Sequence, residues 1–336
     1  MARNTSSTPS TPAGSSEDQP SSPAHRGNSL RSLFRTRNRA LAREIASVER
    51  AADLPSTILV LGDSGTGKDR LARAIHDSSV RAASPFVRID AANLSDELFE
   101  SELFGHERGA FTGAVTAKPG LLEVAEAGTV YLDEVSSLSP AAQAKFLRVL
   151  QEKTFRRLSG LASHPFRARL IVSSRRDLAP LVEKGAFRDD FFYRIDVVSV
   201  RLPRLVDRRE DILPLAREFL KRAARAYERP ARRFTEEAEK TILRHNWPGN
   251  VRELLHVVEK AVLTAESTDV GCEDLPAGAL GSKESLLSAA VENRWTLREL
   301  TDAYIDETLR RAGGNQSLAA KRLGVSRKFL WERAKK

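Results

Sequence analysis

The stretch TILVLGDSGTGKD, at residues 57–69, decides the fold prediction for this chain. A short apolar run ends in a loop that contains three glycines and Lys68, and a helical apolar pattern follows directly. Glycines let backbone N–H groups turn toward a phosphate, and both the following helix N-terminus and the lysine favour that anion. The stretch therefore predicts a strand, a phosphate-binding loop and a helix. We expect a nucleotide to be bound by Gly62, Asp63, Ser64, Gly65, Thr66, Gly67, Lys68 and Asp69.

Further apolar runs alternate with helical patterns and predict the rest of a parallel sheet covered by helices on both faces. After Pro203 the strands stop and helical patterns continue, among them Asn250 with Glu253, which resembles a capping box. We predict an α/β P-loop NTPase fold with a helical lid and a C-terminal all-α domain. The five predicted strands are Thr57–Leu61, Phe86–Asp90, Thr129–Asp133, Ala168–Ser173 and Asp196–Val200.

Composition divides the chain into five parts. Residues 1–35 are rich in Ser and Pro and are expected to form a disordered tail. The α/β domain is predicted at 36–204 and the helical lid at 205–268. Residues 269–293, with several Gly and a Pro, are predicted to form a linker. A helix-turn-helix domain is predicted at 294–336.

Charge and cysteine content limit the possible functions. The 336 residues carry a formal charge of +9, which favours a polyanionic partner. Cys272 is the only cysteine, so an intramolecular disulfide and a cysteine-based zinc site are excluded. Without an apolar run of about 18 residues, the sequence predicts a cytoplasmic protein that has no membrane partner.

Two carboxylates end the strand at 129–133. Asp133 is predicted to hold Mg²⁺, directly or through water, and Glu134 to orient and deprotonate the attacking water. An Asp-Glu pair at a strand end is also typical of a solvated turn, but the preceding phosphate loop favours hydrolysis. Asp69 stands where a Ser or Thr normally supplies a hydroxyl to Mg²⁺, so that ligand is missing.

Arg188 and Arg194 flank Asp189 and Asp190, and two interpretations remain open. The arginines could form salt bridges with these aspartates. Alternatively, they could act as catalytic arginine fingers on the γ-phosphate held by a neighbouring subunit.

A glycine-rich loop lies between the phosphate loop and the acidic strand end. Its glycines allow too many backbone conformations for a stable helix or strand, and Phe111 is its one large side chain. It could be an ordinary mobile loop, but its position suits a segment that moves with the state of the nucleotide. We expect a partner protein to be contacted by Gly109, Ala110, Phe111, Thr112, Gly113 and Ala114.

The last forty residues predict a DNA-binding unit. A helix at 317–323, a turn at Gly324 and a final helix capped by Ser326 form a helix-turn-helix pattern. The density of basic residues suits phosphate contacts, although a solvated basic tail is the alternative. The DNA-contacting residues are predicted to be Ser317, Ser326, Arg327, Lys328 and Arg333.

Over residues 55–265 the chain resembles the AAA+ domain of bacterial sigma-54-dependent transcriptional activators, the enhancer-binding proteins, and its C-terminal unit resembles their Fis-type helix-turn-helix. The segments that carry the resemblance are Gly62–Asp69, Glu102–Glu107 continuing into Gly109–Ala114, Gly128–Glu134, Phe187–Arg194 and Trp247–Leu254.

The resemblance implies a ring, usually a hexamer, that binds ATP and Mg²⁺ between subunits. Within it Arg188 and Arg194 would act in trans, and Arg252 would be the lid arginine that senses the γ-phosphate. The loop with Phe111 and Thr112 would contact sigma-54 and remodel the closed complex of RNA polymerase at enhancer-controlled promoters.

Two departures from the family pattern bear on turnover. Ser174-Arg175 stands where the family has Thr-Asn, and Asp90 stands where it often has Asn. A carboxylate at Asp90 would repel Glu134, so we expect altered rather than abolished hydrolysis.

No regulatory domain is expected before the α/β domain. In this respect the chain resembles family members that are controlled by a separate regulatory protein, or that assemble with a paralogue in a mixed ring. One alternative function is therefore a DNA-binding regulator, or co-activator subunit, with impaired ATPase activity. A AAA+ machine acting on another target is a further alternative.

Overall fold

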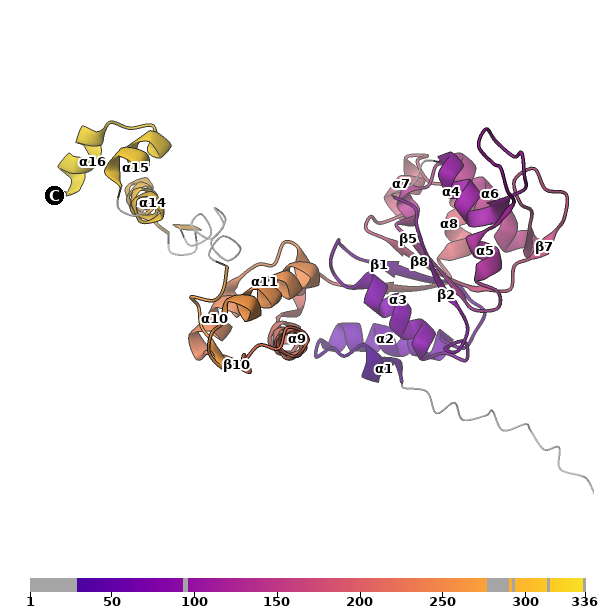
Figure 1. Ribbon diagram of the computed structural model, residues 1–336, viewed down its shortest axis with the longest axis horizontal. Helices are drawn as coiled ribbons and strands as arrows, with labels where there is room; N and C mark the ends of the chain where they lie inside the picture. Colours follow the sequence, from indigo (N-terminus) through magenta and orange to yellow (C-terminus); the bar gives the residue numbers. More distant parts are fainter. Residues whose placement is uncertain (1–28, 93–95, 277–289, 292–293, 313–314, 335–336) are drawn as a thin grey trace, which may run out of the picture.

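Five parallel strands form the central sheet, in the spatial order β2-β5-β8-β1-β9 (Figure 1). The computed structural model describes residues 29–92, 96–276, 290–291, 294–312 and 315–334. The predicted α/β sheet is confirmed, because each strand lies within two residues of its predicted run. The strands are β1 (Ile58–Leu61), β2 (Phe86–Asp90), β5 (Thr129–Asp133), β8 (Arg169–Ser174) and β9 (Val198–Arg201).

Side chains alternate between the two faces of the sheet, and each face has its own apolar core. Ile58 and Val60 pack into one core and Leu59 into the other. The first face is covered by α1 (Leu30–Leu33), α2 (Arg39–Ala51) and α3 (Lys68–Asp77). The second is covered by α4 (Asp96–Phe104), α5 (Leu121–Val124), α6 (Pro140–Glu152), α7 (Ala179–Glu183) and α8 (Asp189–Ile195).

Several short elements lie on the second face of the sheet. A 3-10 turn, η1 (Val135–Ser137), begins one residue after the end of β5. Two short antiparallel pairs of strands are also present, and the glycine-rich loop connects the two strands of the first pair. These pairs are β3 (Gly105–His106) with β4 (Lys118–Pro119), and β6 (Thr154–Phe155) with β7 (His164–Pro165).

The predicted tail at 1–35 extends too far into the chain. Ser29 caps α1, and Leu30 and Phe34 are buried against the core beside α2 and α3. Burial of two large apolar side chains offsets the cost of ordering this segment. The apolar spacing of 30, 33 and 34 was the available signal, but a single helical turn is too short for reliable recognition.

A helical lid follows the sheet domain. It consists of η2 (Leu205–Asp211), α9 (Ile212–Ala226), α10 (Glu236–Arg244) and α11 (Asn250–Thr264), which enclose a separate apolar core. Trp247 lies in that core, and its Nε1 donates to the Ile242 carbonyl at 3.0 Å.

The lid also contains two short strands that the sequence did not predict, β10 (Arg233–Phe234) and β11 (Asp269–Val270), which pair in parallel. Val270 and Leu275 are buried in the lid core, so the predicted lid boundary at 268 is too early. The predicted linker at 269–293 lies outside the described residues from 277 to 289 and at 292–293.

In its described residues, the C-terminal unit contains the helices α14 (Leu297–Arg311), α15 (Gln316–Leu323) and α16 (Arg327–Ala334). Gly324 ends α15 in a left-handed conformation, with φ +68°, as the predicted turn requires. Ile305, Ala319 and Leu330 are buried where the helices meet. The predicted all-α helix-turn-helix is therefore confirmed.

Among the described residues, every helix is too short or too polar to cross a lipid bilayer.

The burial of α1 generates a stability prediction. Leu30→Ala removes a side chain that is fully enclosed by the α2 and α3 core, and it should destabilise the α/β domain by about 2–5 kcal/mol. Leu161→Ala is the matched control, because Leu161 is 88% exposed. Urea unfolding followed by circular dichroism measures both changes. Equal midpoints for the two variants would show that α1 is dispensable for stability.

Candidate nucleotide-binding site

The loop between β1 and α3 depends on glycine at two positions. Gly65 has φ +76°, and a Cβ there would lie 2.3 Å from the Gly249 carbonyl oxygen of the lid. Gly67 caps α3 with φ +106°, a conformation that other residues rarely adopt. Glycine is therefore needed at Gly67 for the turn into α3 and at Gly65 for the close approach of the lid.

Lys68 begins α3 and is held against the loop. Its Nζ donates to the Gly62 carbonyl at 2.8 Å and to the Asp63 carbonyl at 3.2 Å. Burial lowers the pKa of Lys68, although Glu134 and Asp133 oppose that shift by favouring the charged amine. The Lys68 amine thus contacts the phosphate loop and lies close enough to Asp133 and Glu134 to interact with their charges.

Asp133 ends β5 with both carboxylate oxygens engaged. Ser173 Oγ donates to Oδ1 at 2.5 Å, and Arg88 Nη2 donates to Oδ2 at 2.6 Å. The Tyr131 hydroxyl lies 3.1 Å from Oδ1. Arg88 was not predicted as a site residue, because only the pairing of β2 with β5 brings it to Asp133.

Glu134 is positioned by the neighbouring strand end. Its left-handed backbone, with φ +59°, turns the chain away from β5, and its N–H donates to Ser173 Oγ at 3.1 Å. Glu134 Oε1 accepts from Ser136 Oγ at 2.6 Å and from the Arg175 N–H at 3.2 Å. The contact to residue 175 is made by the backbone, so the replacement of Asn by Arg there leaves this hydrogen bond in place.

Asn250 connects the lid to the phosphate loop. The capping box predicted for Asn250 and Glu253 is wrong, because Gly249 is the cap residue and its N–H donates to Glu253 Oε2 at 2.8 Å. Asn250 is buried instead. Its Nδ2 donates to the Ser64 carbonyl at 3.0 Å, and its Oδ1 accepts from the Leu205 N–H at 2.8 Å.

Arg252 lies two residues further along the lid helix and also contacts the phosphate loop. Its Nη1 donates to Ser64 Oγ at 3.0 Å, and its backbone N–H donates to the Gly65 carbonyl at 3.2 Å. The arginine that the family resemblance marked as a lid sensor is thus beside the predicted phosphate site.

Arg208 is a buried cation that was not among the predicted site residues. Its Nη2 donates to the Thr66 carbonyl at 2.6 Å, and Asp211 Oδ2 lies 4.0 Å from Nη1. Burial lowers the pKa of Arg208, while Asp211 opposes that shift. Its neighbours in sequence are also charged, so no local pattern separates it from exposed arginines.

These segments enclose a cavity of about 450 Å³. The phosphate loop, the acidic strand end and the lid all contribute to its walls, and Asp90 and Arg175 lie there too. The loop geometry fits a nucleotide phosphate chain. Among the described residues, no group of three or more His, Cys, Asp or Glu side chains is placed to hold a metal ion by itself. Mg²⁺ at nucleotide sites is commonly bound through one or two carboxylates together with the phosphates, and the Asp133 carboxylate in this cavity fits that role.

Arg188 and Arg194 do not line this cavity. Arg188 forms a bidentate ion pair with Asp190, at 3.0 and 2.7 Å, which is the salt bridge that the sequence left open. Arg194 Nη2 donates to the Leu150 carbonyl at 2.9 Å. Within one chain, therefore, neither arginine is placed to reach the nucleotide.

The glycine-rich loop closes on itself, because the Gly109 N–H donates to the Ala114 carbonyl at 2.9 Å. Phe111 is 45% exposed, and its ring packs edge-on against His106 at 5.0 Å between centroids. Gly109 and Gly113 have positive φ and open space around them. The loop thus presents one partly exposed aromatic side chain on a hydrogen-bonded turn.

In the C-terminal unit, Ser326 caps α16, with its Oγ accepting from the Phe329 N–H at 3.2 Å. Ser317, Ser326, Arg327 and Lys328 are all exposed. The side chain of Arg333, the fifth predicted DNA contact, lies outside what the structure describes.

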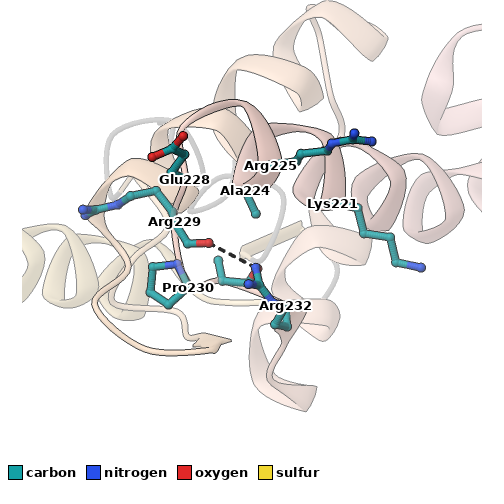
Figure 2. Close-up of a pocket in the computed structure, with 8 residues that line it drawn as sticks. Lys221, Ala224, Arg225, Glu228, Arg229, Pro230 and Arg232 are labelled. Carbon is teal, nitrogen blue, oxygen red and sulfur yellow. Dashed lines mark hydrogen bonds between the residues drawn. The ribbon is translucent and has the colours of Figure 1, made fainter.

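A second hollow of about 600 Å³ lies at the C-terminal end of α9 (Figure 2). Basic side chains dominate its lining, but two of the arginines serve the local fold. Arg232 Nη1 donates to the Arg229 carbonyl at 3.1 Å, and Arg229 donates to the Leu263 carbonyl at 2.5 Å. No part of the phosphate loop lines this hollow, so we assign it no nucleotide role.

Fold and site together define a P-loop protein of the AAA+ class with an attached helix-turn-helix. Residues 34–201 match the sigma-54 interaction domain family. Residues 206–290 match the AAA+ ATPase lid domain family, and residues 296–336 match the Fis family of bacterial regulatory proteins. The chain belongs to the family of sigma-54-dependent transcriptional activators.

Several characterised proteins are similar to this chain. The transcriptional regulatory protein ZraR of Klebsiella oxytoca is 41% identical over 87% of this chain and 65% of its own length. The nitrogen fixation protein AnfA of Azotobacter vinelandii is 38% identical over 84% of this chain and 53% of its own length. The chain therefore spans between about half and two thirds of these relatives.

The crystal structure of NtrX from Brucella abortus in complex with ADP superposes with a TM-score of 0.65, at 34% identity. The match covers 89% of this chain and 68% of NtrX. A second NtrX structure contains ATP and has the same TM-score. These likenesses confirm the AAA+ fold that the sequence predicted.

Removal of the Asn250 side chain should weaken the attachment of the lid. Asn250→Ala leaves the buried Leu205 N–H and the Ser64 carbonyl without this partner, and each lost pairing should cost roughly 1–3 kcal/mol. Urea unfolding measures the loss, with Asn246→Ala as the exposed control. Hydrogen exchange at the start of α11 should also accelerate in Asn250→Ala; unchanged exchange there would contradict the proposed attachment.

Proposed function

We propose that this chain is an ATP-dependent transcriptional activator that binds enhancer DNA and remodels closed complexes of sigma-54 RNA polymerase. The observation that carries the proposal is the cavity shared by Lys68, Asp133–Glu134 and Arg252, which combines phosphate-binding and hydrolytic groups. Membership of the sigma-54 interaction family supports the target. The exposed helix-turn-helix residues support DNA binding.

In the proposed reaction, backbone N–H groups of residues 62–69 and Lys68 bind the phosphates of ATP. Asp133 would hold Mg²⁺, which when bound neutralises charge on the phosphate oxygens. Glu134, held by Ser136 and the Arg175 N–H, orients and deprotonates the attacking water. The lid, through Arg252, reports whether the γ-phosphate is present.

We further propose assembly into a ring, with a hexamer as the expected size. Arg188 and Arg194 lie away from the cavity of their own chain, so a role at ATP requires them to act on a neighbouring subunit. The ion pair between Arg188 and Asp190 would have to open for this contact. The loop at 109–114 would then convert nucleotide changes into movement against sigma-54.

A second candidate function is a co-activator subunit with weak ATPase activity that works in a mixed ring with a paralogue. The observation that favours it is the engagement of both Asp133 oxygens by protein donors. ATPase assays of the chain alone, with Lys68→Ala as the inactive control, separate the two. Turnover no higher than in Lys68→Ala would favour the co-activator.

Transcription in vitro from a sigma-54 promoter tests the main proposal. The wild-type chain should produce transcripts with ATP and none with a non-hydrolysable ATP analogue, and Lys68→Ala should fail with both. Transcripts with the analogue would show that hydrolysis is not the driving step. Activity at a promoter for another polymerase factor, with none at the sigma-54 promoter, would show that the target is wrong.

The loop should separate hydrolysis from activation. Phe111→Ala and Thr112→Ala change exposed or loop positions outside the nucleotide cavity, so most ATPase activity should remain. Loss of an aromatic contact at the centre of an interface costs about 2 kcal/mol or more, so activation should collapse. Val115→Ala, at a neighbouring exposed position, is the control. Equal loss of ATPase activity and transcription would mean that the loop is structural.

A further inference from the structure

A polar cluster beside the nucleotide cavity contains residues that the proposed reaction does not use. In β2 and β5, Arg88 pairs in register with Tyr131, and Asp133 lies two residues further along β5 on the same face. The first turn of α3, which covers that face, contributes Asp69. The fold therefore brings one arginine, one tyrosine and two carboxylates together.

Arg88 joins the two carboxylates through opposite sides of its guanidinium. Nη1 lies 2.8 Å from Asp69 Oδ2, and Nη2 lies 2.6 Å from Asp133 Oδ2. A planar guanidinium can hold two acceptors at once, whereas a lysine amine would act as a single point of charge. Arg88 thus forms a bridge between the helix that follows the phosphate loop and the strand that ends in Asp133.

Arg88 contacts both carboxylates directly, while Lys68 adds positive charge nearby and Ser173 Oγ donates to Asp133 Oδ1. The Tyr131 hydroxyl lies 2.8 Å from Asp69 Oδ1 and 3.1 Å from Asp133 Oδ1, but one hydroxyl hydrogen can be donated to only one of them. The Asp133 side chain is only 14% exposed, which strengthens its repulsion from Asp69. Burial disfavours the charged guanidinium, yet Asp69 and Asp133 outweigh it and raise the pKa of Arg88.

Asp133 is also the residue proposed to hold Mg²⁺. Arg88 and Mg²⁺ are both cations that require Asp133 oxygens, and Arg88 already occupies Oδ2. The Arg88 side chain is 48% exposed and lines the nucleotide cavity, so it has room to move off Asp133. The same two carboxylates can therefore be neutralised by an internal cation or by an external one.

We propose that Arg88 is a displaceable counter-ion of Asp133. It positions Asp133 and Asp69 while the metal is absent, and Mg²⁺ must displace it from Oδ2 to bind. This inference rests on the proposed ATP and Mg²⁺ site. Arg88 is then a positioning residue that raises the metal concentration required to fill the site and makes filling depend on the extra charge that the nucleotide phosphates supply.

Direct metal titration tests the competition. Mn²⁺, which replaces Mg²⁺ and gives an electron paramagnetic resonance signal, is titrated into the full chain with a saturating imido analogue of ATP. Arg88→Gln should lower the Mn²⁺ concentration for half-saturation by about tenfold, the effect expected from loss of one charge-assisted hydrogen bond. Arg222→Gln is the charge control, because Arg222 lines the same cavity but lies over the Phe219 ring.

An unchanged Mn²⁺ affinity in Arg88→Gln would overturn the proposal. An equal increase in Arg88→Gln and Arg222→Gln would also overturn it, because general charge in the cavity would then explain the result. Arg88→Lys keeps the charge but loses the bridge between the two carboxylates. Its Mn²⁺ concentration for half-saturation should therefore lie between the values of the wild type and Arg88→Gln. If Arg88→Gln does not fold, Arg88→Lys decides alone, and a wild-type value in Arg88→Lys overturns the proposal.

Thermal melting gives a second readout. Without metal, Arg88→Gln leaves the carboxylates of Asp69 and Asp133 without this cation, so its melting temperature should fall below that of the wild type. Mg²⁺ with the analogue should raise it more than in the wild type, because ligands stabilise the state that they bind. An equal rise in melting temperature in the wild type and Arg88→Gln would contradict competition between Arg88 and Mg²⁺.

Failure of the proposed function would look different. A wild-type chain that does not bind the ATP analogue would show that the assigned nucleotide site is wrong. In that case a Mn²⁺ titration without nucleotide still tests whether Arg88 competes with the metal for Asp133. Arg88→Gln must then hold Mn²⁺ more tightly than the wild type, and equal affinities overturn it.

Discussion

The parallel pairing of β2 with β5 is the constraint on which the site depends. The register sets Arg88 beside Tyr131 and Asp90 beside Asp133, while alternation of side chains directs the intervening apolar residues into the opposite core. A slip of one residue would move Asp133 into that apolar core. Burial of both faces of the sheet therefore fixes the polar site as well as the hydrophobic packing.

The attachment of the lid depends on a second set of buried polar contacts. Asp211 accepts from Thr36 Oγ1 at 2.6 Å and from the Arg37 N–H at 2.5 Å, and it lies near Arg208, which donates to the Thr66 carbonyl. These contacts link the segment before α2, the start of the lid and the phosphate loop. A buried cation is costly unless it is paired, so this arrangement resists separation of its parts. The phosphate loop and the lid are thus joined by direct hydrogen bonds.

Most of the sheet and the main site residues could be predicted from the sequence, because their signals are local. Apolar runs mark the strands, and a glycine-rich loop followed by Lys68 marks the phosphate site. The predictions that were wrong involve contacts between distant segments: the ordered start at Leu30, the lid core reaching Leu275, and the role of Asn250. In each case the partner lies elsewhere in the chain, and local periodicity contains no information about it.

The sequence by itself determined the fold class, the order of the domains, and the positions of Lys68, Asp133 and the loop around Phe111. Only the tertiary structure decided which groups surround them. Arg88 and Arg208 are ordinary arginines in the sequence, yet one bridges Asp69 and Asp133 and the other is buried against Thr66. The physical reason is that an ion pair depends on distance and burial, and both are set by how strands and helices pack rather than by their spacing along the chain.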